Sequence, residues 1–222
     1  MNSKIFLVDD HPLVREWLTA LINQQADLNV CGVAEDVPEA LEAIGKARPD
    51  VAIVDLELPT TSGLELIKDL SNLYPDVVVL VLSMHEESHY AERALRAGAR
   101  GYITKRESAK SMITGIRAVL AGRLFLSQRL ALDIAERMAL KGPETAETTV
   151  LSLSDRELQV FEMVGKGRET KEIADSLNIS MKTVQAYQAR IKQKLSLKNI
   201  NELMREAILW EERKVKAAPP TF

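Results

Sequence analysis

Five short apolar runs alternate with stretches of helical length in the first half of the chain. The runs occupy residues 5–8, 28–34, 51–54, 77–82 and 101–104. Strands that are apolar on both faces are typical of a parallel sheet covered by helices on each side. Because crossover connections are right-handed, the pattern predicts an α/β domain with a doubly wound, five-stranded parallel sheet.

Polar residues follow four of these five runs. Asp9 and Asp10 follow the first run, Asp55 the third, Ser83 the fourth and Lys105 the fifth. In an open α/β sheet, the carboxyl ends of the strands lie at one edge, where ligands bind. We therefore expect these side chains to meet. Three neighbouring carboxylates repel one another unless a cation lies among them, and Mg²⁺ prefers such oxygen ligands.

This set of residue types suits phosphoryl chemistry. A carboxylate can attack phosphorus, as in aspartyl-phosphate enzymes. A lysine can neutralise the phosphoryl oxygens, and a serine can donate a hydrogen bond to them. An acidic residue after a strand is often only a helix cap, so each residue alone is weak evidence. The joint placement of all five favours a phosphoryl site.

The rest of the chain has helical patterns but no strand-like run. Residues 127–140 carry apolar side chains at helical spacing, whereas residues 141–149 contain Gly and Pro and predict a flexible linker. Ser154 and Glu157 form a capping-box pattern that opens the next helix. The predicted parts are residues 1–122 as the α/β domain, 123–150 as helical connector and linker, 151–216 as a small all-α domain, and 217–222 as a tail.

A helix-turn-helix pattern lies within the all-α domain. A short helix begins near Thr170, residues 178–180 form a tight turn, and Ser180 caps a longer helix ending near Leu195. Between Ser180 and Lys198 there are basic residues but no carboxylate. Basic side chains suit phosphates, and small alanines allow close approach to a DNA groove. The predicted DNA contacts are Lys182, Thr183, Gln185, Ala186, Ala189, Arg190 and Lys194.

Charge is distributed unevenly along the chain, whose net charge is -3. From Thr148 onward there are 13 basic and 10 acidic residues, against 16 basic and 22 acidic residues before it. An acidic first part and a mildly basic second part indicate two different roles. For the basic helix that follows Ser180, the alternative to DNA binding is a solvated surface helix in a small bundle. An ordinary exposed helix, however, would mix both signs of charge.

The sequence also argues against several classes of protein. Cys31 is the only cysteine, which excludes an intrachain disulfide and a cysteine zinc cluster. No apolar run approaches the roughly 18–20 residues of a membrane helix, and the first residues do not resemble a signal peptide. We therefore expect a cytoplasmic protein without membrane contact. The three histidines, His11, His85 and His89, receive no chemical role.

Four motifs in the first part resemble the receiver domain of two-component response regulators. They are DDH at residues 9–11, DLELPTTSG at 55–63, LSMH at 82–85 and GYITK at 101–105. The resemblance implies a sensor histidine kinase as partner, with Mg²⁺ required for phosphorylation.

The same resemblance implies a role for each site residue. Asp55 would be the phosphoacceptor, and Lys105 would pair with the phosphoryl group. Asp10 and Asp55 would bind Mg²⁺ together with the backbone carbonyl of Glu57, while Asp9 would act through water. The implied switch pair is Ser83 and Tyr102, with the hydroxyl moving toward the phosphate and the ring moving inward.

Three further motifs resemble the LuxR-type helix-turn-helix: LSDRE at residues 153–157, KEIA at 171–174 and ISMKTV at 179–184. Together with the receiver, the whole chain is similar to NarL/FixJ-type response regulators. This implies reading of the DNA major groove by the third helix, and a phosphorylation-dependent homodimer formed through the fourth helix around Leu203 and Met204. Gln185, Ala186 and Tyr187 depart from the Lys-x-His found often in the family, and Gln185 can pair with adenine.

Three hypotheses follow. The first is a transcription factor switched by phosphorylation of Asp55, which is not an enzyme with substrate turnover. The second is a DNA-binding regulator controlled by protein contacts without phosphorylation, although the complete set of site residues argues against it. The third is a metal-dependent phosphohydrolase, with Glu57 two residues after the nucleophile as general acid. It lacks an insert to cover a substrate and leaves the helix-turn-helix unexplained.

Overall fold

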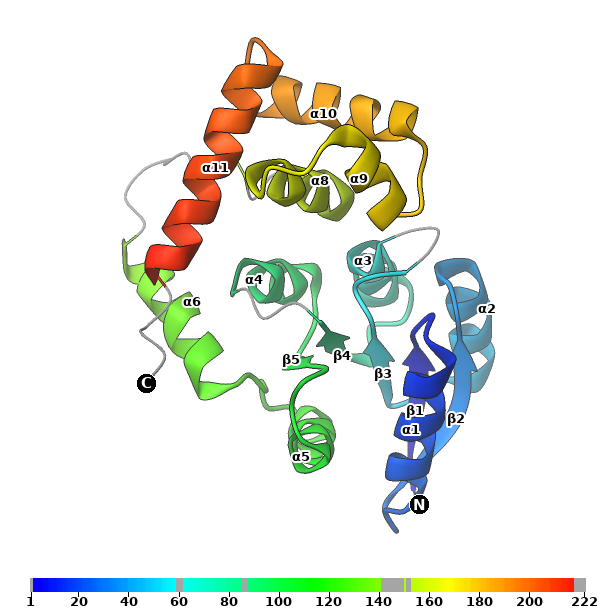
Figure 1. Ribbon diagram of the computed structural model, residues 1–222. Helices are drawn as coiled ribbons and strands as arrows, with labels where there is room; N and C mark the ends of the chain where they lie inside the picture. The colour runs from blue at the N-terminus through cyan, green and yellow to red at the C-terminus, as the bar shows by residue number, and fades with distance from the viewer. Residues whose placement is uncertain (1, 59–61, 85–87, 141–149, 151–152, 218–222) are drawn as a thin grey trace. The chain divides into compact units, whose positions relative to one another are not determined.

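The five predicted strands form one parallel sheet in the order β2-β1-β3-β4-β5 (Figure 1). This order, with each strand joined to the next through a helix, confirms the doubly wound α/β fold. The strand bounds are β1 Ser3–Val8, β2 Leu28–Ala34, β3 Val51–Val54, β4 Val78–Ser83 and β5 Gly101–Thr104. The helices of this part are α1 Pro12–Asn23, α2 Val37–Ala47, α3 Gly63–Leu73, α4 Ser88–Ala97, α5 Ala109–Leu120 and α6 Gln128–Leu140.

The computed structural model describes residues 2–58, 62–84, 88–140, 150 and 153–217. The chain divides into two units, Met1–Leu140 and Lys141–Phe222, and each is described by itself. The predicted linker at residues 141–149 lies outside the described residues, and so does His85. No helix in the described ranges has both the length and the apolar character that a membrane crossing requires.

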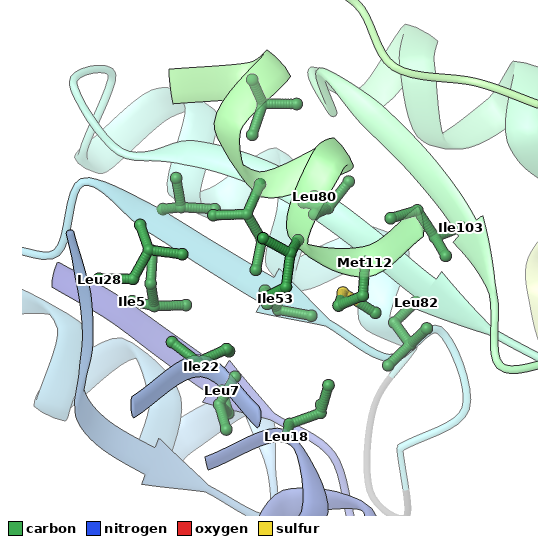
Figure 2. Close-up of a cluster of buried hydrophobic side chains, with 14 residues drawn as sticks. Ile5, Leu7, Leu18, Ile22, Leu28, Ile53, Leu80, Leu82, Ile103 and Met112 are labelled. Atoms are coloured by element: carbon green, nitrogen blue, oxygen red, sulfur yellow. The ribbon is translucent and has the colours of Figure 1, made fainter. Parts of the chain in front are cut away.

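One face of the sheet is covered by α1 and α5. Alternate residues of the strands point toward these helices and form a buried cluster with them (Figure 2). Leu18 and Ile22 enter this cluster from α1, and Met112 and Ile116 enter it from α5. Each such side chain stabilises the fold by about 1.5–3 kcal/mol relative to an exposed one. Helices α2, α3 and α4 follow one another on the opposite face.

The open edge of β5 is closed by the chain that follows α5. The backbone N–H of Tyr102 donates to the carbonyl of Phe125 at 2.9 Å, and the N–H of Phe125 donates to the carbonyl of Arg100 at 3.1 Å. A Cβ on Gly115 would lie 2.9 Å from the Phe125 ring, and a Cβ on Gly101 would lie 3.1 Å from its carbonyl oxygen. Glycine at these two positions therefore makes room for Phe125.

Helix α6 packs against α4 in the same unit, with Leu130 buried. The predicted end of the α/β domain at residue 122 thus falls inside the first unit, which continues to Leu140. The physical reason is that the residues after 122 supply both the cover for the β5 edge and an apolar side chain for α4. Periodicity predicted α6 correctly but not its packing partner.

The second unit is all-helical, with α8 Asp155–Gly165, α9 Thr170–Ser176, α10 Met181–Lys194 and α11 Ile200–Ala217. The predicted capping box is present, because Ser154 and Glu157 each accept from the backbone N–H of the other. Asn178 has φ of 52° in the turn before α10, a left-handed conformation that Asn tolerates better than most residues. Ser180 then caps α10 by accepting from Thr183 N. These local features produce the predicted helix-turn-helix.

Candidate functional site

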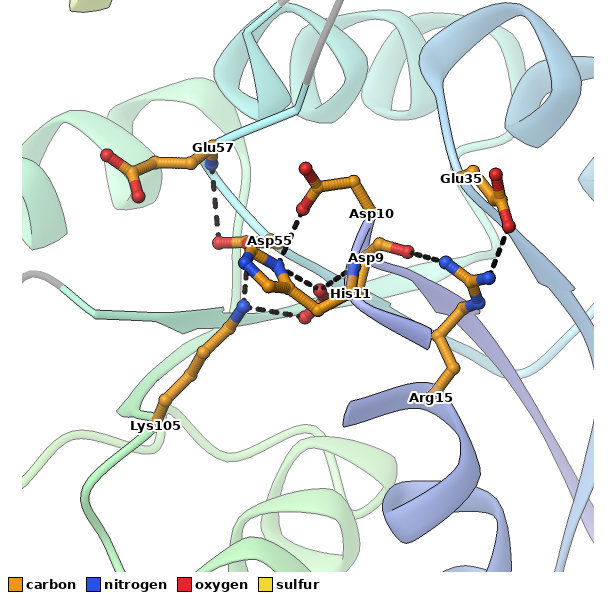
Figure 3. A network of polar contacts seen from close by, with 8 residues as sticks. All are labelled: Asp9, Asp10, His11, Arg15, Glu35, Asp55, Glu57 and Lys105. Carbon is orange, nitrogen blue, oxygen red and sulfur yellow. Dashed lines mark hydrogen bonds and ion pairs between the residues drawn. The ribbon is translucent and has the colours of Figure 1, made fainter. Parts of the chain in front are cut away.

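Asp9, Asp10, Asp55 and Lys105 lie together at the carboxyl ends of β1, β3 and β5 and form the acidic pocket (Figure 3). The ammonium of Lys105 lies 2.7 Å from Asp9 Oδ2 and 2.7 Å from Asp55 Oδ2. Both carboxylates are 2% exposed. Asp9 follows β1 and Asp55 follows β3, which are neighbours in the sheet, while Lys105 follows β5. The parallel topology therefore brings Lys105 into contact with Asp55, 50 residues earlier, and with Asp9, which is still farther away in sequence, as predicted.

Burial changes the acid–base properties of this pocket. Removal from water raises the pKa of Asp55 to about 6, with a smaller contribution from the charge of Asp9, and the attraction of Lys105 only partly opposes this rise. Burial alone would lower the pKa of Lys105, but the Asp55 and Asp9 carboxylates outweigh it and raise that pKa. Lys105 therefore keeps its positive charge, whereas ionisation of Asp55 lowers the stability of the folded protein.

The pocket has the donor set of a divalent cation site. Asp9, Asp10, His11 and Asp55 each offer a ligand atom, and these atoms lie within 4.8 Å of one another. Three carboxylates beside one lysine carry excess negative charge, which a hard cation such as Mg²⁺ would neutralise. The backbone N–H of Glu57 donates to Asp55 Oδ1 at 3.3 Å, so the Glu57 peptide borders the same carboxylate. These residues fit a magnesium ion.

Of the predicted switch pair, Ser83 adjoins this pocket through Lys105, and Tyr102 is buried on the neighbouring strand. Ser83 is the last residue of β4 and is buried, and its carbonyl accepts from the backbone N–H of Lys105 at 2.8 Å. Tyr102 lies on the adjacent strand β5 and is 0% exposed. The tyrosine side chain is thus already inside the fold in this conformation.

Four residues around the pocket were given no role by the sequence patterns. His11 Nδ1 lies 2.7 Å from Asp10 Oδ1. Arg15, in the first turns of α1, donates to the backbone carbonyl of Asp9 and pairs with Glu35 after β2. A Cβ on Gly63 would overlap the backbone carbonyl oxygen of Asp55. His11 belongs to the DDH motif but was expected to have no chemical role, and no periodicity identifies the other three.

The exposed face of α10 contains most of the predicted DNA contacts. Lys182, Gln185, Ala186, Ala189 and Arg190 are all exposed. The opposite side packs into the unit through buried apolar residues. The helix therefore presents one basic and polar surface that carries two small alanines at its centre, as the heptad-like spacing of these residues requires.

Two predicted residues differ from the others on this surface. Thr183 is half-buried, and its hydroxyl lies 2.8 Å from that of Ser180 at the helix start. Lys194 donates to Glu157 Oε2 at 2.6 Å. Burial of Glu157 opposes its ionisation, but the hydrogen bonds from Lys194 and Ser154 outweigh burial and lower its pKa. The Lys194 ammonium therefore binds α8 within its own unit, which the charge pattern alone did not indicate.

Helix α11, the fourth helix of the second unit, holds in different environments the two residues that were expected together at a dimer interface. Leu203 is 0% exposed and belongs to the core of the second unit. Met204 is 45% exposed and lies on the same surface of α11 as Ile200 and Ile208, which are 42% and 40% exposed. An interface on α11 would thus involve this stripe and not Leu203.

Comparison with known families matches both units. Residues 5–117 match the response regulator receiver domain, and residues 151–207 match the bacterial regulatory proteins of the LuxR family. The chain belongs to the response regulator family. This response regulator is 34% identical over 209 residues to the oxygen regulatory protein NreC of Staphylococcus carnosus, covering 92% of this chain and 96% of NreC.

Solved structures agree with this assignment. A LuxR-family two-component response regulator from Aurantimonas sp. SI85-9A1 is 35% identical, with a TM-score of 0.60, covering 63% of this chain and 99% of that one. The response regulator RcsB of Salmonella typhimurium, studied for its DNA interaction, is 25% identical with a TM-score of 0.57, covering 93% and 98%. This response regulator therefore combines a receiver with a LuxR-type DNA-binding domain and functions in transcription regulation within a two-component system.

Proposed function

We propose that Asp55 accepts a phosphoryl group from a sensor histidine kinase, with Mg²⁺ as the required cofactor. The observation that supports this most is the contact of Lys105 with both Asp55 and Asp9 inside a pocket of three carboxylates. In the transfer, the N–P bond of phosphohistidine breaks and a bond forms between phosphorus and an Asp55 Oδ. The electron pair of the broken bond stays on the histidine nitrogen.

The residues of the pocket have separate tasks in this step. Asp10, Asp55 and the backbone carbonyl of Glu57 would hold Mg²⁺, and Asp9 would act through a water ligand. The bound ion would supply positive charge for the phosphoryl oxygens. Lys105 loses its contact with Asp55 as phosphorus bonds there, and its ammonium then pairs with a phosphoryl oxygen. Burial of Asp55, which is 2% exposed, would limit access of water to the acyl phosphate.

The output of this switch is regulated binding to double-stranded promoter DNA. The Ser83 hydroxyl would donate a hydrogen bond to a phosphoryl oxygen. Tyr102 would be the second residue of the switch. A homodimer of the phosphorylated chain would place two copies of α10 on the DNA. Lys182, Thr183, Gln185, Ala186, Ala189 and Arg190 would face the major groove, whereas Lys194 would stabilise the domain through Glu157.

We assign the proposed roles to the predicted parts of the chain. Residues 1–122 would form the phosphoacceptor region, residues 151–216 would bind DNA, residues 123–150 would connect them, and residues 217–222 would form a tail. The protein would act in the cytoplasm, where kinase and promoter are both accessible. It would take up one phosphoryl group per chain and would not turn over a substrate as an enzyme does.

Intact mass after incubation with Mg²⁺ and a small phosphodonor tests this proposal. We expect one added phosphoryl group on the parent chain and none on Asp55→Asn, with the same circular dichroism for both proteins. No uptake by folded parent protein would instead favour control by protein contacts alone. Continuous release of phosphate from the donor at many equivalents per chain would favour the phosphohydrolase hypothesis.

A further inference from the structure

Arg15 joins the ends of two strands beside the acidic pocket. It lies one turn into α1, and its guanidinium donates to the backbone carbonyl of Asp9 at 2.5 Å. The other terminal nitrogen pairs with Glu35, which directly follows β2 (Figure 3). The Arg15 side chain is only 12% exposed. The guanidinium therefore links α1, the end of β1 and the residue after β2.

The carbonyl that Arg15 binds belongs to the peptide bond between Asp9 and Asp10. The N–H of Asp9 donates to the Ala34 carbonyl at 3.2 Å, so the backbone at Asp9 is held on both sides. Rotation of that peptide would turn the Asp10 Cα and move its carboxylate away from Asp55. Since the ligand atoms of Asp9, Asp10 and Asp55 lie within 4.8 Å of one another, the orientation of this peptide affects the whole donor set.

We propose that Arg15 is a positioning residue for the Mg²⁺ site, and that Glu35 in turn fixes Arg15. Neither residue contacts the pocket's ligand atoms; Arg15 acts through the Asp9–Asp10 peptide. This inference rests on the proposed function, because it concerns the same cation site. Residues that orient metal ligands from outside typically change metal affinity by about 10–100-fold when they are replaced.

Electrostatics alone predicts the opposite result, which makes the proposal testable. Arg15 is a cation close to a cation site, so its removal should strengthen Mg²⁺ binding if charge were its only influence. If Arg15 positions the peptide, its removal weakens Mg²⁺ binding despite the favourable change in charge. Lysine at this position keeps the charge but lacks the planar guanidinium that spans two acceptors. Arg15→Lys should therefore also weaken binding, whereas a pure charge effect leaves it unchanged.

The experiment measures Mg²⁺ binding by isothermal titration calorimetry on the full chain, for the parent, Arg15→Gln and Arg15→Lys. Arg117→Gln is a matched control, because Arg117 on α5 forms a similar pair with Asp27, at 2.7 Å, in the same unit. We expect the dissociation constant to rise about tenfold for both Arg15 variants and to stay within twofold for the control. Phosphoryl uptake should need correspondingly more Mg²⁺ while reaching the same rate at saturation.

Each outcome separates this inference from the proposed function. Unchanged or tighter Mg²⁺ binding by Arg15→Gln and Arg15→Lys, with normal binding by the parent, would refute the positioning role alone. Loss of Mg²⁺ binding by the parent would refute the proposed site itself. If Arg15→Gln does not fold, Arg15→Lys still gives the decisive comparison, because it retains the buried cation. A lower melting temperature with an unchanged dissociation constant would assign Arg15 to stability only and overturn the proposal.

Discussion

Replacement of Asp55 by asparagine should change how stability depends on pH. The buried carboxyl has a pKa of about 6, against an ordinary value of 3.8 in the unfolded chain. The native state therefore holds this proton more tightly than the unfolded state does. Stability from this group is complete below pH 3.8 and is lost as the pH rises to about 6.

The size of this loss follows from the shift in pKa. About two pKa units at 1.36 kcal/mol each give a total of roughly 3 kcal/mol, of which about 2 kcal/mol develops between pH 4.5 and 7.5. Asparagine has a similar shape but no ionisable group, so Asp55→Asn should not lose this stability as the pH rises. The variant should thus gain roughly 2 kcal/mol relative to the parent across that interval.

Urea unfolding in EDTA at several pH values measures this difference. Trp17 lies in the first unit and Trp210 in the second, so a Trp210→Phe background lets fluorescence follow the receiver. Asp27→Asn is a useful control, because the hydrogen bond from Arg117 lowers the pKa of the Asp27 carboxyl below 3.8, so the stability lost in this variant should not change with pH between 4.5 and 7.5. Parallel stability profiles for the parent and Asp55→Asn would refute the reasoning. Excess Mg²⁺ at pH 7.5 should stabilise the parent selectively.

Three further substitutions test other parts of the structure. Gly63→Ala should destabilise the receiver by about 1–3 kcal/mol in urea unfolding, since its Cβ would overlap the Asp55 carbonyl; an unchanged midpoint would contradict this. Arg190→Ala should weaken binding to a target promoter and reduce its salt dependence, as measured by fluorescence anisotropy. Arg205→Ala on α11 should change neither; equal effects of the two variants would contradict DNA binding by the α10 face. Phe125→Ala should destabilise the receiver by about 1–3 kcal/mol, because the ring is only partly buried against the core. Faster hydrogen exchange at Tyr102 should accompany the loss; protection equal to that of the parent would contradict the closure of the β5 edge.

The elements and the central pocket could be predicted because local signals agree with the topology. The run from Val51 to Val54 is apolar and short, and Asp55 directly follows it, so the strand end and the site residue are specified together. In a parallel sheet, this local placement is sufficient to bring Asp55 close to Asp9. The same argument located Lys105, although 50 residues separate it from Asp55.

Contacts between distant polar groups were not predictable in the same way. Lys194 ends a basic helix and resembles a DNA contact, but its partner Glu157 lies 37 residues earlier and is buried by the fold. Arg15 presents no pattern in sequence, because its acceptor is a backbone carbonyl. Helix α11 carries two apolar stripes at helical spacing, one with Leu203 and one with Met204. Periodicity does not show which stripe is buried, because that depends on the packing of α11 against α8.

The closure of the β5 edge by Phe125 affects how response regulators of this kind can exchange effector domains. An exposed sheet edge presents unpaired N–H and C=O groups to other chains and favours aggregation. A fusion that replaces everything after residue 122 would remove Phe125 and leave the Tyr102 N–H without its carbonyl partner. A junction after Leu140 would retain both the edge cover and α6. For recombination, the transferable module is therefore the longer segment, which keeps the sheet edge protected whatever effector follows.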